Sequence, residues 1–184
     1  MARIENDFLG EKELPDSAYY GVQTLRGKEN FHITGIPMSA EPYFVKAFGY
    51  VKKAAALANR DLGVLDARVA DAIVGACDRL IAGEMCDQFV TDFIQGGAGT
   101  STNMNANEVI ANLALESLGH KKGEYQFVSP NDHVNFGQST NDIYPTAFRL
   151  ALILRLASYM DALRRLQDAF YAKGKEFGRV LKMG

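Results

Sequence analysis

The chain has 184 residues, of which 47% are hydrophobic and 23% charged, a composition typical of a globular domain and not of a disordered tail. Its 20 Lys and Arg side chains nearly balance its 22 Asp and Glu side chains. The formal net charge is therefore −2, and the composition indicates no basic surface for nucleic acid or an anionic membrane. The longest apolar runs, 54–58 and 150–154, are far shorter than the roughly 20 residues of a membrane span.

The first residues and the cysteines indicate the compartment. The N-terminal sequence is acidic and lacks the apolar segment of a signal peptide. Cys77 and Cys86 stand nine residues apart without the His or Cys partners of a zinc pattern, so we interpret them as reduced thiols. We therefore expect a soluble cytoplasmic protein.

Residues 1–38 are rich in glycine and proline and show no helical period. This pattern predicts an extended, turn-rich arm with one short hairpin. Its contacts with the core must come from its aromatic side chains, which are Phe8, Tyr19, Tyr20 and Phe31.

Two helices are predicted next. The first starts after a cap at Ser39, has Pro42 in its first turn and ends before Gly63. Its apolar face is predicted at Phe44, Phe48, Val51, Ala55 and Ala58. The second starts after a cap at Asp66 and ends at Gly83, with a face at Val69, Ile73, Ala76, Cys77 and Leu80.

A third helix is predicted over 103–118 and a fourth from about Asp142 to about Lys182, with a polar loop over 120–140 between them. If Asp142 is the cap, Pro145 falls in the first turn, where it removes no helical hydrogen bond. Residues 147–160 are apolar nearly all round, so this helix needs partners on several sides. We expect it to pack in an oligomer or in a bundle whose other helices lie outside these 184 residues.

Hydroxyl and amide side chains gather at the starts of the third and fourth helices. The first cluster is Gln95-Gly-Gly-Ala-Gly-Thr-Ser-Thr-Asn-Met-Asn-Ala-Asn-Glu108 and the second is Gln138-Ser-Thr-Asn-Asp-Ile-Tyr-Pro-Thr146. Each lies where free N–H groups and the helix dipole favour an anion, although ordinary turns and caps explain each cluster equally well alone. Because neither contains Lys or Arg, together they favour a small carboxylic acid over a phosphate.

Other polar residues remain open to two interpretations. His133 is a base or, in the simpler reading, a structural hydrogen-bonding residue, since no spacing supports a metal site. Glu108 is a base or a capping or solvated carboxylate. Asn103, Asn105 and Asn107 are expected to bond to neighbouring loops, because asparagine is unfavourable inside a helix.

These residues together resemble the aspartase/fumarase superfamily, and its aspartase branch most closely. The match rests on segments found in the family's order, which are Asp7–Lys12, Ala18–Arg26, Glu29–Phe31, Val51–Ala56, Gly97–Glu108, Gly119–Gly123, Pro130–Asn135 and Gln138–Asp142 with Pro145-Thr146. Class II fumarases typically have Ser-Ser-Asn where this chain has Ser139-Thr140-Asn141, and Ser-Gly-Thr where it has Ala98-Gly99-Thr100.

The resemblance implies reversible elimination of ammonia from L-aspartate to give fumarate, without an organic cofactor, and it assigns no metal-binding residue in this chain. It implies that Thr100, Ser139 and Thr140 bind the carboxylate beside the carbon that loses its proton, and that Asn141 contacts the amino group. It also matches Asn131, Asp132 and His133 to a second dicarboxylate site, although the histidine that fumarases carry before the proline is Ser129 here.

The resemblance further implies a mainly α fold. Residues 1–140 would form an N-terminal domain, with a turn-rich arm and short helices, and 141–184 the first long helix of a central bundle. Family members are homotetramers of longer chains, whose serine base lies on a loop that these 184 residues lack. This implies an N-terminal fragment that is inactive alone and contains no catalytic residue. The alternatives are a fragment of a class II fumarate hydratase and a non-catalytic helical interaction module.

Overall fold

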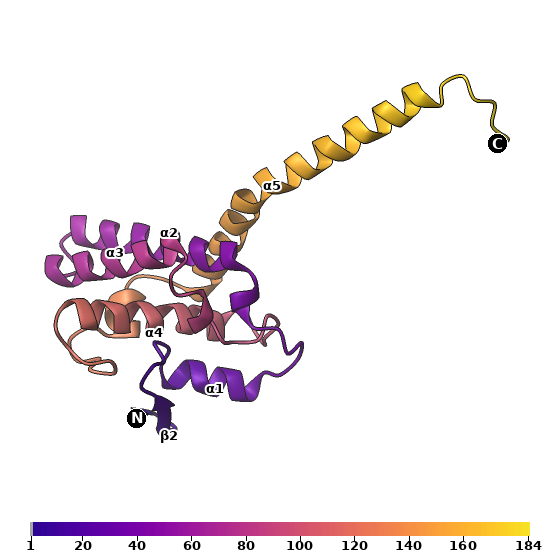
Figure 1. Ribbon diagram of the computed structural model, residues 1–184. Helices are drawn as coiled ribbons and strands as arrows, with labels where there is room; N and C mark the ends of the chain where they lie inside the picture. Colours follow the sequence, from indigo (N-terminus) through magenta and orange to yellow (C-terminus); the bar gives the residue numbers. More distant parts are fainter. Residues whose placement is uncertain (1) are drawn as a thin grey trace.

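The computed structural model describes residues 2–184, and it is mainly helical, as the sequence predicts (Figure 1). A hairpin and three single turns of 3-10 or π helix (η) accompany five α-helices in this part of the chain. The elements are β1 (Ala2–Asp7), β2 (Gly10–Pro15), α1 (Val22–Asn30), η1 (Met38–Ala40), α2 (Pro42–Asp61), α3 (Ala67–Ala82), η2 (Cys86–Gln88), α4 (Thr100–Ser117), η3 (Pro130–Val134) and α5 (Thr140–Glu176).

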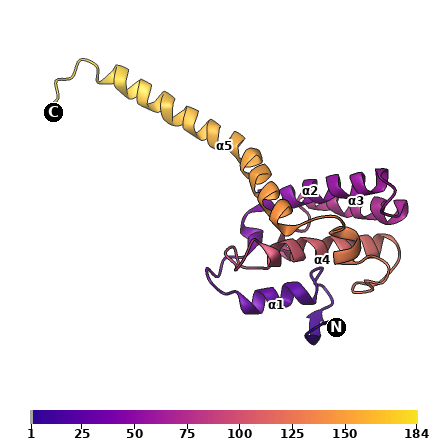
Figure 2. The same cartoon turned by 180° about the vertical axis from the view of Figure 1, so that it is seen from behind.

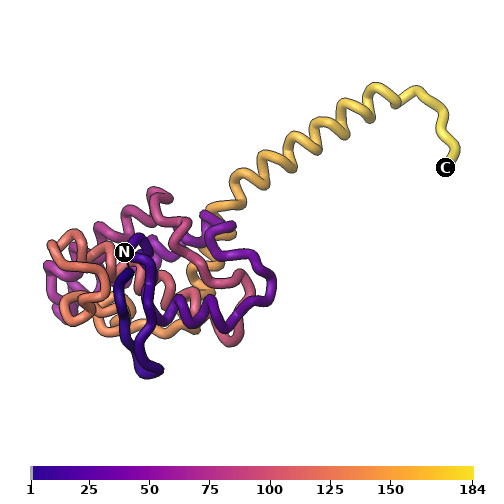
Figure 3. The backbone as a smooth tube through the Cα atoms, turned by 60° about the horizontal axis from the view of Figure 1, so that its bottom comes forward, coloured from indigo at the N-terminus to yellow at the C-terminus, as the bar shows by residue number. Residues whose placement is uncertain are grey.

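The helices form layers around α4. The pair α2 and α3 lies on one side of α4, and α1 with the hairpin lies on the other (Figures 1 and 2). The main hydrophobic core joins α2, α3, α4 and the first turns of α5, with Phe48 of α2, Ile73 of α3 and Ile110 of α4 all buried. α5 starts inside this body and then leaves it, so its far end stands clear of the other elements (Figure 3).

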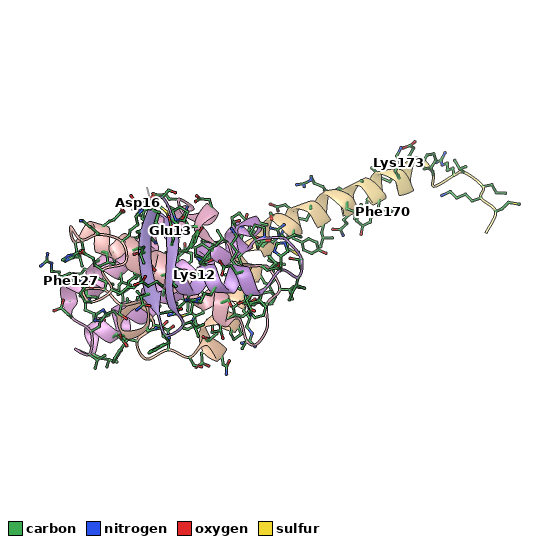
Figure 4. All side chains as sticks on the ribbon, turned by 90° about the horizontal axis from the view of Figure 1, so that it is seen from below. Lys12, Glu13, Asp16, Phe127, Phe170 and Lys173 are labelled. Atoms are coloured by element: carbon green, nitrogen blue, oxygen red, sulfur yellow. The ribbon has the colours of Figure 1, made fainter. Side chains whose placement is uncertain are left out.

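The hairpin predicted in the N-terminal arm is confirmed. β1 and β2 pair antiparallel from Ala2 opposite Pro15 to Asp7 opposite Gly10. The backbone N–H of Leu9 donates to Oδ1 of Asp7 (2.9 Å), which closes the two-residue turn. Figure 4 labels Lys12 and Glu13 of β2, which lie on opposite faces of the hairpin, and Nζ of Lys12 pairs with Oε2 of Glu29 in α1 (2.7 Å).

The absence of a helix from the arm was predicted wrongly, because Val22–Asn30 forms α1. Its N-cap is Gly21, which has no side chain to accept the first N–H groups of the helix. Glu108 of α4 accepts them instead, from Gly21 (2.8 Å), Gln23 (3.0 Å) and Thr24 (3.0 Å). The signal for this helix start therefore lies more than 80 residues away in the sequence.

The helix predicted after Ser39 begins at Pro42, and its buried face is rotated from the predicted one. The fully buried residues are Phe44, Val45, Ala47, Phe48, Gly49, Lys52 and Ala56, whereas Val51, Ala55 and Ala58 lie at the edges. The predicted stripe avoided Lys52 because lysine is rarely buried. Lys52 nevertheless occupies the middle of the buried face, between Phe48 and Ala56.

The second predicted helix, α3, is confirmed at both ends. Asp66 accepts the N–H groups of Arg68 (2.9 Å) and Val69 (3.1 Å), and Gly83 ends the helix in a left-handed conformation. Its buried face includes Ile73, Ala76, Cys77 and Leu80, as predicted, with Ala70 in place of Val69. Local capping and periodicity suffice here because both signals lie within the helix itself.

The third helix, α4, starts at Thr100 and not at Asn103. Gly99 supplies the cap position with a φ of 86°, so Thr100, Ser101 and Thr102 form the first turn and do not precede it. Every residue from Thr102 to Leu115 is buried. α4 is thus the central helix of the body, which explains why its sequence has no polar face.

The fourth helix, α5, starts at Thr140 after a cap at Ser139, and it ends at Glu176. Pro145 therefore lies beyond the first turn, contrary to the prediction from a cap at Asp142. Since proline has no N–H, the carbonyl of Asn141 loses its helical donor. The polar loop before α5 also contains one structured turn, η3.

Only the first turns of α5 belong to the core. Its buried residues are Ile143, Ala147 and Ala151, and Phe44 of α2 packs edge-on against Tyr144 and Phe148 with ring centroids 5.3 and 5.9 Å apart. Beyond these turns the helix is exposed, as Figure 4 shows for Phe170 and Lys173. Within residues 147–160, Ala147, Phe148 and Ala151 therefore pack in this chain, whereas Leu152, Ile153 and Leu156 are exposed. The expected partners outside these 184 residues stay a prediction.

Candidate functional site

The two polar helix starts that the sequence singles out lie against each other. Nδ2 of Asn103, in the first turn of α4, donates to Oγ1 of Thr140, the first residue of α5 (3.0 Å). One amide thus links helix starts that are 37 residues apart along the chain. Each helix start presents N–H groups and the positive end of a dipole to this region.

Close packing at Gly99 also joins the two helix starts. A Cβ atom on Gly99 would lie 2.1 Å from the ring of Tyr144, so the start of α4 rests on the first turn of α5 through bare backbone. Gly99 also has a φ of 86°, which is the left-handed region. Glycine is therefore required here for two independent reasons.

The glycine-rich loop before α4 is held closed by Gln95. Its Oε1 accepts the backbone N–H of Thr102 (2.9 Å), and its Nε2 donates to the hydroxyl of Thr102. Thr102 is fully buried and also lies 3.3 Å from the hydroxyl of Thr91. Thr102 is therefore structural, whereas the neighbouring Thr100 is exposed and free of this network.

At the start of α5, both hydroxyl oxygens already accept hydrogen bonds from the protein. Oγ of Ser139 accepts the N–H of Asn141 (3.2 Å), and Oγ1 of Thr140 accepts from Asn103. A hydroxyl that accepts from the protein keeps its own hydrogen to donate elsewhere. Both side chains are therefore prepared to donate to an anion.

A buried lysine supports the loop that leads into α5. Nζ of Lys52 donates to Oδ1 of Asn135 (2.9 Å) and to Oε1 of Gln138 (2.9 Å). Asn103 also donates to Oδ1 of Asn135 (3.1 Å), so the lysine joins the network that reaches Thr140. Burial lowers the pKa of Lys52 to about 7, partly offset by the nearby Cys77.

The proposed ligand residues open onto different pockets. Thr100 and Ser101 line one of about 560 Å³, together with Arg26, Asn30 and Phe31 from α1 and its end. Asn141 and Tyr144 line another of about 520 Å³, opposite the glycine-rich loop 97–99. The turn at Gly99–Ser101 separates the two, so a single chain brings Thr140 to Asn103 but does not place Thr100 and Asn141 in one cavity.

The three residues of the predicted second site do not line one pocket. Asn131 lines a pocket of about 380 Å³ with Glu108 and Tyr125, while Asp132 and His133 lie outside its lining. Nδ1 of His133 accepts the backbone N–H of Ser129 (2.8 Å), and Asp132 accepts from the hydroxyl of Ser129 (2.9 Å). These contacts are those of a capped turn, and they favour the structural interpretation of His133.

Glu108 is buried, so the solvated interpretation is wrong, and the capping interpretation is confirmed by its bonds to the start of α1. Burial raises its pKa to about 7, against the hydrogen bonds from Thr24 and Gln23, and the nearby carboxylate of Glu5 raises it further. Glu5 itself accepts from Val22 (2.9 Å) and Tyr125 (3.1 Å). The two carboxylates together hold the N-terminal segment against α4.

Of the three asparagines of α4 that were expected to bond to loops, two do so. Asn105 donates to the carbonyl of Gln88 (2.9 Å) and accepts from the N–H of Val90 (2.9 Å), while Asn103 reaches Asn135 and Thr140. Asn107 instead donates to the sulfur of Met104 within its own helix (3.5 Å).

Residues 2–184 show neither a metal-binding cluster nor a membrane-spanning helix. No group of three or more His, Cys, Asp or Glu side chains in this range is arranged to hold a metal ion. None of the helices in the same range combines the length and apolar character needed to cross a membrane.

Lys52 is the residue of this network that sequence reasoning missed. The sequence signal for it is its spacing, four residues after Phe48 and four before Ala56, which places it on the buried face of α2. Asn135 and Gln138 were noted as members of polar motifs, but no local pattern shows that their side chains turn inward to a lysine of another helix.

The comparisons with known proteins agree on one family. A family model described as lyase matches residues 10–184. The chain is 58% identical over 182 residues to an aspartate ammonia-lyase of Helicobacter pylori strain J99, 58% to one of Pseudomonas fluorescens, and 54% over 183 residues to one of Escherichia coli K12. In each case the match covers 99% of this chain but only 38–39% of the relative.

Solved structures with the same fold include two enzymes of related kinds. A fumarate lyase:delta crystallin from Brucella melitensis is 55% identical with a TM-score of 0.95, and the match covers 100% of this chain and 43% of that one. A class II fumarase from Schistosoma mansoni is 37% identical with a TM-score of 0.88, over 100% of this chain and 39% of that one.

Proposed function

Because the chain belongs to the lyase family, we propose that its 184 residues supply the carboxylate-binding part of an aspartate ammonia-lyase active site. The observation that carries this proposal is the hydrogen bond from Asn103 to Thr140, which holds two helix N-termini together at one place. The identities of 54–58% to aspartate ammonia-lyases support aspartate and fumarate as the ligands.

The binding chemistry follows from neutral donors. Thr100, Ser139 and Thr140 carry hydroxyls at helix starts, and Ser139 and Thr140 accept their internal hydrogen bonds through oxygen. Their hydrogens are then free for a carboxylate. Removing the proton beside this carboxylate adds negative charge to it, so donors aimed at that charge stabilise the transition state more than the bound substrate.

Asn141 completes the substrate contacts in this proposal. Its side chain is exposed at the mouth of the pocket that Tyr144 and Pro145 also line. An amide oxygen there accepts from the amino group of L-aspartate, which orients the group that leaves. A neutral amide distinguishes an amino group from a hydroxyl group less sharply than a charged side chain would. Analysis of the product therefore establishes the substrate.

The chain needs further residues to form a complete site. Thr100 and Asn141 open onto separate pockets, and both are exposed. We expect other segments or other copies to close the space between them, as the family resemblance implies for a serine base and for a homotetramer. The 184 residues by themselves are then expected to show no turnover.

A hybrid chain tests the proposal. It joins residues 1–184 to the part of the Helicobacter pylori aspartate ammonia-lyase that the match does not cover, which is 61% of that enzyme because the match covers 39% of it. We expect fumarate formation from L-aspartate by the hybrid and none by the 184 residues alone. A hybrid that assembles like the Helicobacter pylori enzyme but does not release fumarate would contradict the proposal.

The likeness to a class II fumarase leaves one competing reaction within the same family. The same hybrid distinguishes the two, because an ammonia-lyase adds ammonia to fumarate to give aspartate, whereas a hydratase adds water to give malate. Aspartate as the product supports the proposal. Malate as the main product would replace it with the hydratase.

A further inference from the structure

Lys52 is the most deeply buried charged side chain of α2. It has no exposed surface, and it lies between Phe48 and Ala56 on the helix face that packs into the core. An unpaired ammonium in such a position is costly, so its partners must compensate for the lost water. Packing alone does not explain the residue, because a methionine of similar length would fill the space without a charge.

The compensating partners are two side-chain amides from one loop. Oδ1 of Asn135 and Oε1 of Gln138 each accept from Nζ of Lys52 at 2.9 Å. The same amides brace the loop, since Nδ2 of Asn135 donates to the carbonyl of Gln138 (3.0 Å) and Nε2 of Gln138 donates to that of Val134 (2.9 Å). The loop therefore closes around the lysine nitrogen.

This loop ends where the substrate-binding turn begins. Gln138 is followed directly by Ser139 and Thr140, so fixing its side chain fixes the entry into α5. A second path runs through Asn103, which donates both to Asn135 (3.1 Å) and to Thr140 (3.0 Å). Lys52 is thus connected to Thr140 by two routes. One runs through Gln138 and the backbone that follows it, and the other through the side chains of Asn135 and Asn103.

We propose that Lys52 is a positioning residue, which aims the hydroxyls of Ser139 and Thr140 at the substrate carboxylate through Asn135, Gln138 and Asn103. This inference rests on the function proposed above. Lys52 does not touch the substrate, and it acts by holding the turn that does.

Amide hydrogen exchange tests the positioning directly in the 184-residue chain. Lys52→Met removes the ammonium and keeps the length of the side chain. We expect exchange in 135–143 to accelerate by roughly tenfold or more, while exchange in α3 changes little, because the loop opens locally. Lys53→Met is the matched control, since Lys53 lies on the surface and pairs with Asp78 (2.6 Å). It should leave 135–143 unchanged.

Kinetics of the hybrid enzyme supply a readout that a loss of folded protein does not change. We expect Lys52→Met to lower kcat/KM for L-aspartate by about 10- to 100-fold, with a higher KM as well as a lower kcat, since small misplacements of binding groups cost that much. Fewer folded molecules would lower the apparent kcat and leave KM unchanged. Lys53→Met should behave like the unmodified hybrid.

Asn135→Ala provides a second route if Lys52→Met does not fold. It cuts the link from the lysine to Asn103 and should reproduce both the local exchange and the raised KM. Uniform acceleration across the chain, or an unchanged KM in folded variants, would overturn the inference. An inactive hybrid combined with local opening of 135–143 would reject the proposed function and retain the structural role of Lys52.

Discussion

Glu108 shows how one side chain determines a distant element. Its carboxylate accepts three backbone N–H groups at the start of α1 and also the hydroxyl of Thr24, so four donors depend on it. Because backbone N–H groups cannot accept, each of these donors needs an acceptor, and the carboxylate oxygens of Glu108 supply it. The sequence near α1 offers no such group, since Gly21 occupies the cap position.

Glu108→Gln therefore tests the capping role. An amide keeps the shape but turns one of the two acceptors into a donor that faces other donors. We expect the free energy of unfolding to fall by about 1–3 kcal/mol in urea denaturation. Glu116→Gln is the control, because Glu116 is exposed and accepts only from the hydroxyl of Tyr19. Equal stabilities of the two variants would contradict the role.

Two of the buried charged groups, Glu108 and Lys52, predict a pH dependence of stability with opposite signs. The pKa of Glu108 rises from 4.5 to about 7, so the folded chain holds an extra proton and the free energy of unfolding falls between pH 4.5 and 7. The pKa of Lys52 falls from 10.5 to about 7, so the unfolded chain holds the extra proton and stability rises between pH 7 and 10.5.

Variants separate the two contributions in denaturation series at different pH. Glu108→Gln should flatten the fall below pH 7, and Lys52→Met should flatten the rise above it. The ionisable neighbours are Glu5 and Tyr125 at Glu108, and Cys77 at Lys52. All three residues are retained in both variants. Slopes that persist in the variants would show that other groups carry the linkage.

At the scale of elements, the contact of α4 with α5 depends on a glycine. Gly97 and Gly99 both have positive φ, but only Gly99 would place a Cβ against Tyr144. Gly97→Ala should cost about 1–2 kcal/mol from backbone strain alone. Gly99→Ala should cost about 1–3 kcal/mol more, because the ring must move. Thermal unfolding measures both, and equal losses would show that the clash is relieved without cost.

The elements predicted correctly are those whose signals are local. Asp66 and Gly83 bound α3 from within its own sequence, whereas α5 starts at Thr140 and not at the predicted Asp142. α1 was missed because its caps, Glu5 and Glu108, come from elsewhere. The face of α2 was misplaced because Lys52 is buried only through amides of a distant loop.

The candidate site follows the same division. The hydroxyl and amide residues were predictable, since helix starts favour them and the family resemblance assigns them. Two features of the site depend on how α4 packs against α5. Asn103 links the two helix starts, and Thr100 and Asn141 line different pockets. The residue pattern within either helix does not predict how the two helices pack against each other.

At the scale of the whole molecule, α5 carries an apolar surface that the body does not cover. Its exposed apolar residues include Leu152, Leu156, Tyr159, Leu163, Leu166 and Phe170. A single exposed helix of this kind favours association, because burying such surface is favourable by about 25 cal/mol per Å². We propose that residues 141–184 form a bundle with other helices, consistent with the oligomer that the family resemblance implies.

Sedimentation tests this expectation on the 184-residue chain. The unmodified chain should sediment as an oligomer, and Leu156→Lys should shift it toward the monomer by placing a charge in the apolar surface. Ser158→Lys introduces the same side chain two residues further along α5 and should have little effect. A stable monomer at micromolar concentration would support an interaction module that awaits a different partner.

The central claim is that neutral hydroxyls at two joined helix starts bind the substrate carboxylate, and Thr140→Val in the hybrid enzyme tests it most directly. Valine keeps the shape and removes the hydroxyl, and Thr146→Val is the control at an exposed threonine of the same helix. We predict that kcat/KM for L-aspartate falls by about 100- to 1000-fold, as for other donors to a developing negative charge. The free energy of unfolding should fall by only about 0.5–1.5 kcal/mol, because Thr140→Val also removes the acceptor of the Asn103 hydrogen bond. A folded Thr140→Val enzyme with the kcat/KM of the unmodified hybrid would contradict the account.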